Sequence, residues 1–261
     1  MITRIVNIND DDHDVYVGRG SIYGNPFTHL PLNKTQALIS CLSRIEAIKK
    51  YELWIWGTLW ISSHHPPTVD KIKELRGKRL GCHCYPKACH GSVLARIAEM
   101  TDEQTNEVLA IVPVKESFEE STEDLWDLYL KGYPACITTN CVRKSDGMAV
   151  MGAGIALQAA RRYPDIAVNL GNILEINGDH PAFAHIGHDL YSFPTKIDWR
   201  KESDVDLIVQ SAKEMMEFVR SNKINRIVLP RPGCANGKLY WSDMSKALKN
   251  ILDGRVIIVG R

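Results

Sequence analysis

Three cysteines and a histidine lie close together in the first half of the chain: Cys82, Cys84, Cys89 and His90. Cys82 and Cys84 are two residues apart, so on a strand their thiols would share one face. Cys89 and His90 stand at the start of a helix predicted over residues 92–100, where the helix dipole favours a thiolate. Three thiolates and an imidazole suit a soft tetrahedral metal, so the cluster predicts a zinc site. The spacing leaves open two alternatives, a reactive thiol site and a group of inert buried cysteines.

A glycine-rich segment near the N-terminus offers a second set of polar groups. Residues 14–27 read DVYVGRGSIYGNPF. The first two glycines have the spacing of a dinucleotide-binding fingerprint, but the third comes one position late. An Asn-Pro pair would also break the helix that should follow, so the segment does not predict a Rossmann fold. Two interpretations remain: a structural turn, or a tight loop that places three side chains against an anion, namely Arg19, Ser21 and Asn25.

Two further glycine loops occur in the second half, each between a predicted strand and a predicted helix. Their glycines allow backbone amides to approach an anion, and the helix that follows the first loop presents free N–H groups. Two such loops at the strand ends of one sheet can enclose a diphosphate. Either loop alone is also compatible with a strand-to-helix turn that needs glycine for packing. The predicted ligand-binding residues are Met151, Gly152, Ala153, Gly154, Ile155 and Ala156 in the first loop, and Gly233, Cys234, Ala235, Asn236, Gly237, Lys238 and Leu239 in the second.

Three ordered segments of the second half resemble the macrodomains. They are TTNC at residues 138–141 with AVMGAGIALQ at 149–158, SFPTKIDWR at 192–200 with Ser203 after it, and LPRPGC at 229–234 closing on Trp241. The likeness is to one branch of that family, which holds the antitoxin macrodomains that remove ADP-ribose from thymidine in DNA, and related phage proteins. It covers nearly all of the second half.

The resemblance implies an ADP-ribose site and assigns its parts. Asn140 would contact the distal ribose, and the two glycine loops would enclose the diphosphate. Lys196 matches the lysine that acts in the hydrolases of this branch, so Lys196 and Asn140 are the predicted catalytic residues. An amine beside an anomeric carbon can attack it or stabilise the opened sugar as a Schiff base, once it has lost its proton. An ordinary surface lysine is the alternative for Lys196.

The sequence departs from the family pattern at three places. Gly237 stands where related protein-directed hydrolases carry an aspartate. Asp198 stands where the branch usually has a histidine. The Gly-Asp pair expected near the adenine, just after the first strand, is replaced by residues 115–118, with Glu116 as a substitute for the aspartate. These departures keep a purely binding role open.

The first half resembles an uncharacterised domain common in phage and bacterial proteins. The pattern is an Arg-Gly-Ser…Gly-Asn-Pro-Phe loop, followed by a Cys-x-Cys…Cys-His-Gly motif ahead of a helix. The match spans residues 5–98. No activity follows from this resemblance.

The pattern of elements predicts an α/β protein of two domains. In the first half we expect a helix over residues 35–60. A polar stretch at 101–107 marks the boundary, which gives a small α/β domain at 1–105 and a macrodomain at 106–261. The second domain should begin with a buried strand at 108–114 and contain an amphipathic helix at 204–221. Its strands alternate with helices, which predicts a three-layer α/β/α architecture, and the resemblance implies a mixed sheet.

Composition limits the partners and the compartment. The 32 basic and 31 acidic residues give a net charge of +1, which argues neither for nor against nucleic acid. No apolar run reaches the length of a membrane span, and the N-terminus lacks the features of a signal peptide. The seven cysteines do not form a disulfide framework. We therefore expect a cytoplasmic protein, in the host cytoplasm if phage-encoded, with no membrane partner.

The sequence supports several functional hypotheses. The first is a macrodomain protein that binds ADP-ribose and hydrolyses it from a modified macromolecule, with nucleic acid preferred over protein by analogy with the branch. The second is a non-catalytic reader of ADP-ribose or a related nucleotide. Such a reader could be attached to a first domain that modifies nucleotides or nucleic acid by cysteine or metal chemistry. A phosphatase acting on ADP-ribose phosphate is the third.

Overall fold

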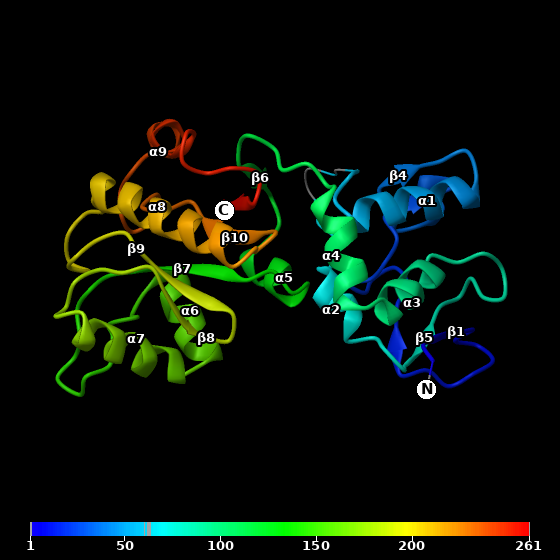
Figure 1. The fold of residues 1–261 in the computed structure, drawn as a ribbon, viewed down its shortest axis with the longest axis horizontal. Coiled ribbons are helices and arrows are strands. Elements are labelled where there is room, and N and C mark those ends of the chain that lie inside the picture. The colour runs from blue at the N-terminus through cyan, green and yellow to red at the C-terminus, as the bar shows by residue number, and fades with distance from the viewer. Residues whose placement is uncertain (1, 60, 62–63, 261) are drawn as a thin grey trace. The chain divides into compact units, whose positions relative to one another are not determined.

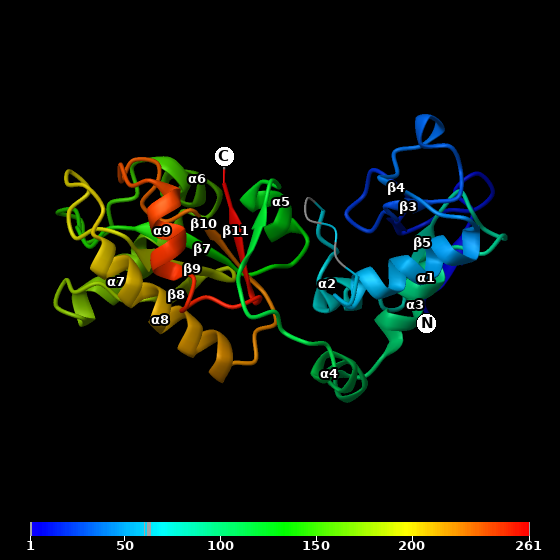
Figure 2. The same cartoon turned by 90° about the horizontal axis from the view of Figure 1, so that it is seen from above.

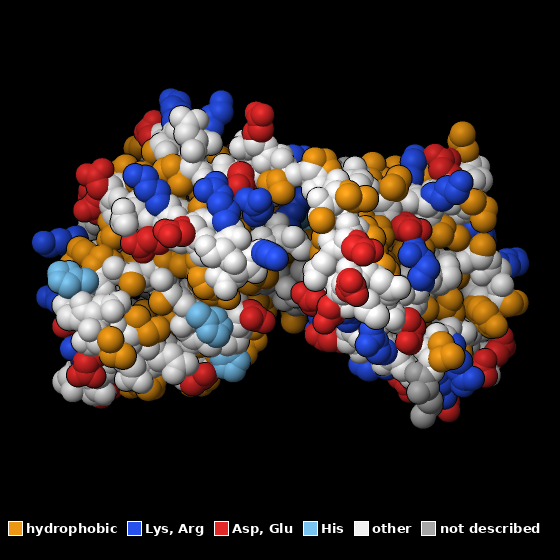
Figure 3. All heavy atoms as spheres, in the orientation of Figure 1, with side chains coloured by type: hydrophobic (Ala, Val, Ile, Leu, Met, Phe, Trp, Pro, Cys, Tyr) orange, Lys and Arg blue, Asp and Glu red, His pale blue; other side chains and the backbone are white. Residues whose placement is uncertain are grey.

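The computed structural model describes residues 2–59, 61 and 64–260 of the 261-residue chain. The chain divides into two compact units, Met1–Pro113 with Leu130–Gly132, and Val114–Tyr129 with Tyr133–Arg261. The boundary expected between residues 105 and 106 falls inside a helix of the first unit. No helix in the described part of the chain has the length and apolarity that crossing a bilayer requires. On the face drawn in Figure 3, acidic and basic side chains are interspersed on each unit.

The first unit is built on a small parallel sheet. Its strand order is β1-β5-β2, and a separate parallel pair is formed by β3 and β4. Helix α3 packs against β1, and α2 packs against α3. Its elements are β1 (Arg4–Val6), β2 (Val15–Tyr16), β3 (Phe27–Thr28), the 3-10 helix η1 (Leu32–Lys34), β4 (Ile39–Ser40), α1 (Arg44–Ile55), α2 (Val69–Lys73), β5 (Arg79–Gly81), α3 (Gly91–Glu99) and α4 (Asp102–Ala110).

The helix expected over residues 35–60 is shorter than predicted. Helix α1 begins only after Ser43, whose side chain accepts a hydrogen bond from the backbone N–H of Glu46 and so caps the helix. Residues before it form strand β4, and Leu42 is almost fully exposed. The apolar spacing over 35–43 therefore does not belong to a helix. The predicted end at Trp60 lies outside the described residues.

The prediction of a strand at residues 108–114 is wrong. Residues 102–110 form helix α4, because Thr101 and Gln104 make a capping box. The Thr101 hydroxyl accepts from the Gln104 N–H, and the Gln104 side chain accepts from the Thr101 N–H. The polar stretch at residues 101–107, where the sequence placed the domain boundary, is the N-cap and the first part of this helix.

The second unit contains a six-stranded sheet in the order β6-β11-β10-β7-β9-β8. The first five strands in this order run parallel to one another, and the edge strand β8 runs antiparallel to β9. Its elements are β6 (Glu119–Ser121), α5 (Leu125–Leu130), β7 (Ala135–Thr139), α6 (Gly154–Arg162), α7 (Asp165–Ile176), β8 (Ala184–Gly187), β9 (Leu190–Pro194), α8 (Val205–Ser221), β10 (Ile227–Pro230), α9 (Trp241–Leu248) and β11 (Val256–Val259).

Helices cover both faces of this sheet (Figures 1 and 2). One apolar core joins α5, α6 and α7 to the sheet, and includes Leu128, Ile166 and Leu170. A second core joins α8 and α9 to the other face, and includes Ile208 and Met215. The predicted three-layer α/β/α arrangement with a mixed sheet is therefore confirmed, and so is the amphipathic helix expected at 204–221.

Candidate functional site

The three segments that carry the macrodomain resemblance follow three neighbouring strands. Strands β10, β7 and β9 lie side by side and are parallel, so their carboxyl ends meet at one edge of the sheet. Asn140 directly follows β7, Lys196 comes two residues after β9, and the second glycine loop follows β10. Ligands of open α/β sheets bind at such an edge.

Lys196 is a buried side chain at this edge, with 9% of its surface exposed. Its Nζ donates to the backbone oxygen of Lys201 at 2.9 Å and to that of Asn236 at 3.1 Å. An ammonium group has three N–H donors, so one remains without a partner among the described residues. Lys196 is therefore not an ordinary surface lysine, and one of its contacts ties it to the second glycine loop.

The surroundings of Lys196 shift the protonation equilibrium of its amine toward the neutral form. Burial is the main cause that lowers the pKa of its amine, and the positive charge of Lys238 lowers it further. Glu202 acts in the opposite direction, but its carboxylate is paired with Lys238 at 3.1 Å. A lysine with a lowered pKa carries a larger fraction of nucleophilic amine near neutral pH.

The two glycine loops lie next to each other. A Cβ atom placed on Gly154 would be 3.3 Å from the Asn236 side-chain nitrogen. Gly154 also has a φ of 56°, a conformation that favours glycine. It begins α6, whose first turn receives no side-chain cap from Ala153. Gly152, Ala153 and Gly154 are exposed, so the N–H groups at this helix start are available to an anion.

Asn140 cross-links the loop that leads to this helix. Its Nδ2 donates to the backbone oxygen of Val150 at 2.8 Å, and its Oδ1 accepts from the N–H of Val142 at 2.9 Å. The side chain therefore shapes the first glycine loop. One of its two amide N–H groups has no partner among the described residues, and could reach a ligand.

Gly237 has no room for a side chain. A Cβ atom there would lie 2.1 Å from Ser203 Oγ and 2.4 Å from the Gly233 oxygen. The backbone of the same two segments is joined, since the Ser203 N–H donates to the Gly237 oxygen at 3.1 Å. Packing therefore leaves no room at position 237 for the aspartate that the resemblance would place there. Asp198, a second departure from the family pattern, pairs with Arg200.

One carboxylate at this end of the sheet was missed. The expected position of an acidic residue near the adenine is just after the first strand. Because that strand is β6 rather than residues 108–114, the position falls at residues 122–124 and not at Glu116. Asp124 is exposed there, and its Oδ1 accepts from the N–H of Trp126 at 2.8 Å. The signal in the sequence was an acidic residue ahead of the apolar helix α5.

The loop at residues 18–27 in the first unit is held by its own polar side chains. The Arg19 guanidinium donates to the backbone oxygens of Asn25 and Phe27 at 3.1 and 3.0 Å. The Ser21 hydroxyl donates to the Gly18 oxygen at 2.8 Å, and the Asn25 amide donates to the Ala47 oxygen at 3.2 Å. These bonds give each of the three predicted residues a structural role in the turn. Arg19 and Asn25 also line a cavity, described below.

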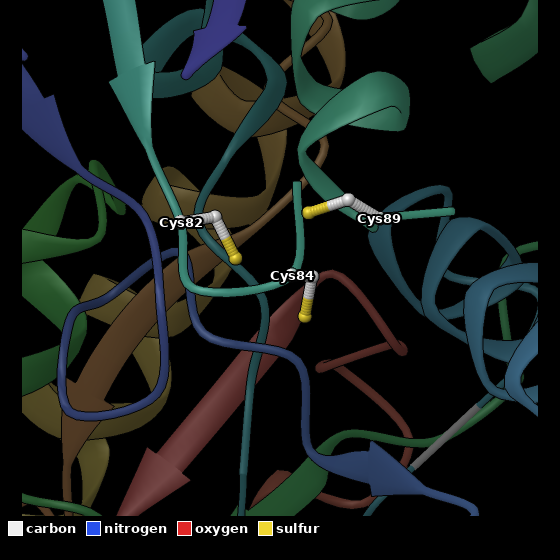
Figure 4. A group of neighbouring side chains, drawn as sticks. All are labelled: Cys82, Cys84 and Cys89. Atoms are coloured by element: carbon white, nitrogen blue, oxygen red, sulfur yellow. The ribbon is translucent and has the colours of Figure 1, made fainter. Parts of the chain in front are cut away.

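The three cysteines of the first unit come together. Cys82 follows β5 and Cys89 precedes α3, with Cys84 in the connecting loop (Figure 4). Their sulfurs all lie within 4.8 Å of one another. Hydrogen bonds with the thiols of Cys82 and Cys89 lower the pKa of Cys84, and hydrogen bonds with those of Cys82 and Cys84 raise the pKa of Cys89. The thiols therefore form one interacting group, contributed by residues that are only two to seven positions apart in the sequence.

His90 lies beside this group but has another partner. Its Nε2 is 2.8 Å from the backbone oxygen of Val17, which can only accept, so Nε2 carries the proton. Its Nδ1 lies 3.9 Å from the Cys89 sulfur. The ring also packs edge-on against Tyr51. The structure thus brings together three of the four predicted metal ligands and places His90 at their side.

Comparison with known proteins relates both halves of the chain to other proteins. Residues 3–100 match a family model described as a domain of unknown function, DUF4326. The DNA ADP-ribosyl glycohydrolase of Mycobacterium tuberculosis is 32% identical over 123 residues, which are 42% of this chain and 32% of the relative. The chain thus spans about a third of the length of that relative. Among solved structures, the macrodomain of Mycobacterium tuberculosis DarG is 28% identical with a TM-score of 0.40, over 48% of this chain and 86% of that one.

The sequence similarities confirm the two predicted resemblances, to the macrodomains of the DNA ADP-ribosyl glycohydrolase branch and to a domain of unknown function. A further relative is the uncharacterized 12.4 kDa protein in the nrdA-td intergenic region of Enterobacteria phage T4. It is 33% identical over 98 residues, which are 37% of this chain. Since the match covers 77% of that phage protein, the chain belongs to the same family as the phage T4 protein.

Proposed function

We propose that the second unit binds ADP-ribose at the carboxyl edge of its sheet and uses Lys196 to release it from a modified macromolecule, with nucleic acid preferred over protein. The observation that carries this proposal is the environment of Lys196. The amine is buried and bonded to two backbone oxygens, one of which belongs to the second glycine loop. The name of the glycohydrolase relative supports the same substrate class.

The chain supplies each part that the reaction needs. The N–H groups at the start of α6 and the second glycine loop hold the diphosphate. The neutral amine of Lys196 attacks the anomeric carbon of the distal ribose, and the bond from that carbon to the modified group breaks. The leaving group takes up a proton, and the Lys196 nitrogen loses one as its bond to the carbon forms. Water then hydrolyses the adduct, which frees ADP-ribose and restores the lysine.

The test measures binding and release on one preparation of the full chain. Calorimetry follows ADP-ribose binding, and mass spectrometry follows release of ADP-ribose from ADP-ribosylated DNA, RNA and protein. Lys196→Met keeps the aliphatic stem but removes the amine, so it should retain binding and lose release. Lys196→Arg keeps a charge that cannot be removed near neutral pH, and should also lose release. Lys213→Met, at an exposed position of α8, is the matched control and should behave like wild type.

A reader of ADP-ribose is the second candidate, because the filled space at Gly237 leaves no place for the aspartate of the protein-directed hydrolases. Binding without release from any of the three substrates would favour the reader. Release that survives in Lys196→Met would exclude the role given to the lysine. Absence of ADP-ribose binding would overturn both candidates. Release of phosphate from ADP-ribose phosphate would favour a phosphatase instead.

A further inference from the structure

The two motifs of the first unit meet in one cavity. A hollow of about 160 Å³ is lined by the loop after β2, by α1 and by the loop after β5. The first motif contributes Arg19 and Asn25, and the second contributes all three clustered cysteines. Residues more than fifty positions apart in the sequence therefore share one site. Liquid water occupies about 30 Å³ per molecule, so the space suits a ligand group of a few heavy atoms.

The three thiols are spaced for a single tetrahedral metal ion. With Zn–S bonds of about 2.3 Å, two sulfurs on one zinc are about 3.8 Å apart. The sulfurs of Cys82, Cys84 and Cys89 lie within 4.8 Å of one another, so side-chain movements of about 1 Å would bring them onto one ion. The backbone N–H of Gly91 donates to the Cys89 sulfur at 3.3 Å, an interaction that stabilises a metal-bound thiolate.

The imidazole of His90 is poorly placed to be a fourth ligand. The hydrogen bond from its Nε2 to Val17 and the contact with Tyr51 fix the ring. Its remaining nitrogen faces Cys89 but lies outside the cluster that the three sulfurs form. Three thiolates supply three of the four positions that zinc takes, and all three cysteines line the cavity. A fourth position facing this cavity would be open to solvent or to a ligand.

Two arginines give the wall of the cavity its positive charge. Arg19, Arg44, His29 and His83 line it, and none of the described lining residues is an aspartate or a glutamate. The two hydrogen bonds that Arg19 makes to the backbone hold its guanidinium at the wall of the cavity. Arg44 is tied to the other motif, since it donates to the Ala88 oxygen at 3.4 Å. Guanidinium groups held in this way bind oxyanions through paired N–H donors.

We propose that Cys82, Cys84 and Cys89 hold a zinc ion whose fourth position opens into this cavity and accepts an oxyanion of phosphate size, which Arg19 and Arg44 help to bind. The three thiols lose their protons as the metal binds. Zinc with three thiolates has one net negative charge, so an anionic fourth ligand needs the compensating charge of the two arginines. Structural zinc sites are closed by four protein ligands, whereas a site with an exchangeable position is typical of ligand-binding or catalytic zinc.

The metal is tested first, on the full chain purified without chelators. Elemental analysis by mass spectrometry should find equimolar zinc in the wild type and much less in Cys84→Ser. Cys41→Ser is the matched control, because Cys41 is a partly buried cysteine of the same unit outside the cluster, and it should keep its zinc. The wild-type chain with cobalt in place of zinc should show thiolate-to-cobalt charge transfer and the intense visible bands of a tetrahedral site. A wild-type chain that binds neither metal would overturn the proposal, whatever the folding of the variants.

The open position is tested by titrating inorganic phosphate into the cobalt form at constant ionic strength, with chloride as the control salt. Phosphate should shift the visible bands of the wild type. Arg44→Gln should bind cobalt fully but need about tenfold more phosphate for the same shift, since it loses a charge-assisted contact. Bands that phosphate leaves unchanged, or an Arg44→Gln chain that responds like wild type, would overturn the oxyanion site.

Discussion

Replacing Gly237 by alanine tests whether packing, and not chemistry, dictates glycine in the second loop. The added Cβ would lie 2.1 Å from Ser203 Oγ, 2.4 Å from the Gly233 oxygen and 2.8 Å from the Gly233 Cα. Two of these three atoms belong to the backbone, so the loop itself must shift. Overpacking of this kind costs about 1–3 kcal/mol. For a unit of this size, each kcal/mol lowers the melting temperature by about 2–4 °C, so we expect a drop of about 2–12 °C.

The assay has to report the second unit by itself, because two units can unfold separately. Hydrogen-exchange mass spectrometry on peptides from β7, β9 and β10, recorded as the temperature is raised, meets this need. Gly152→Ala is the control: a Cβ there meets no atom within 4 Å, and stability should change by less than about 0.5 kcal/mol. Adding Ser203→Ala to Gly237→Ala removes the nearest atom but leaves the Gly233 oxygen, so most of the loss should persist. Wild-type stability of Gly237→Ala, or full rescue by Ser203→Ala, would refute the steric argument.

Three other changes follow from the same structure. Burial disfavours the charged form of Lys196 and lowers its pKa, so its neutral fraction grows at a lower pH than that of an ordinary lysine. The rate of ADP-ribose release should therefore rise with pH and reach half its maximum below the ordinary lysine pKa. A rate that falls over that range would contradict this. Thr101→Ala removes one half of the capping box with Gln104, and should lower the stability of α4 by about 1 kcal/mol, seen as faster amide exchange in residues 102–110. Asp124→Asn keeps the oxygen that accepts from the helix α5 but removes the charge, so it should weaken ADP-ribose binding in calorimetry without changing the melting temperature; unchanged affinity would mean that Asp124 serves only as a helix cap.

The segments that form the candidate site of the second unit were predictable because each is a short contiguous stretch. The glycine loop before α6, the stretch around Lys196 and the loop after β10 each carry their own sequence pattern. Parallel strands then place all three at one edge. What the sequence could not show is the burial of Lys196, since its partners are backbone oxygens of residues 201 and 236, which no side-chain pattern reveals.

The start of the second unit was misread for a physical reason. The apolar run that begins at Val108 favours a strand, but the Thr101–Gln104 capping box starts a helix that extends through it. The true first strand, β6, reads Glu119-Glu120-Ser121 and lacks any apolar pattern. Glu119 is nevertheless buried, because it is paired with Lys115 and Arg226. Strand prediction depends on alternating apolar residues, and β6 has none because ion pairs, one of them with the distant Arg226, accompany the burial of Glu119.

In the first unit, sequence analysis identified the motifs but not their proximity in space. Both of its motifs were recognised separately, and each was compatible with a purely structural role. Only the fold shows that Arg19 and the three cysteines line the same cavity. No periodic pattern relates residues that are more than fifty positions apart, so their convergence cannot be read from the sequence.

The position of the Lys196 amine does not depend on the identity of the side chain at position 236. Its amine is positioned by main-chain oxygens, which every residue type provides, so substitutions at Lys201 or Asn236 leave those acceptors in place. The Asn236 side chain instead faces Gly154 in the other loop. Substitutions at position 236 can thus change the contact between the two loops while the Lys196 amine keeps its backbone partners. Under the proposed function, the selectivity of the site would change gradually, by selection or by design, without loss of the lysine geometry.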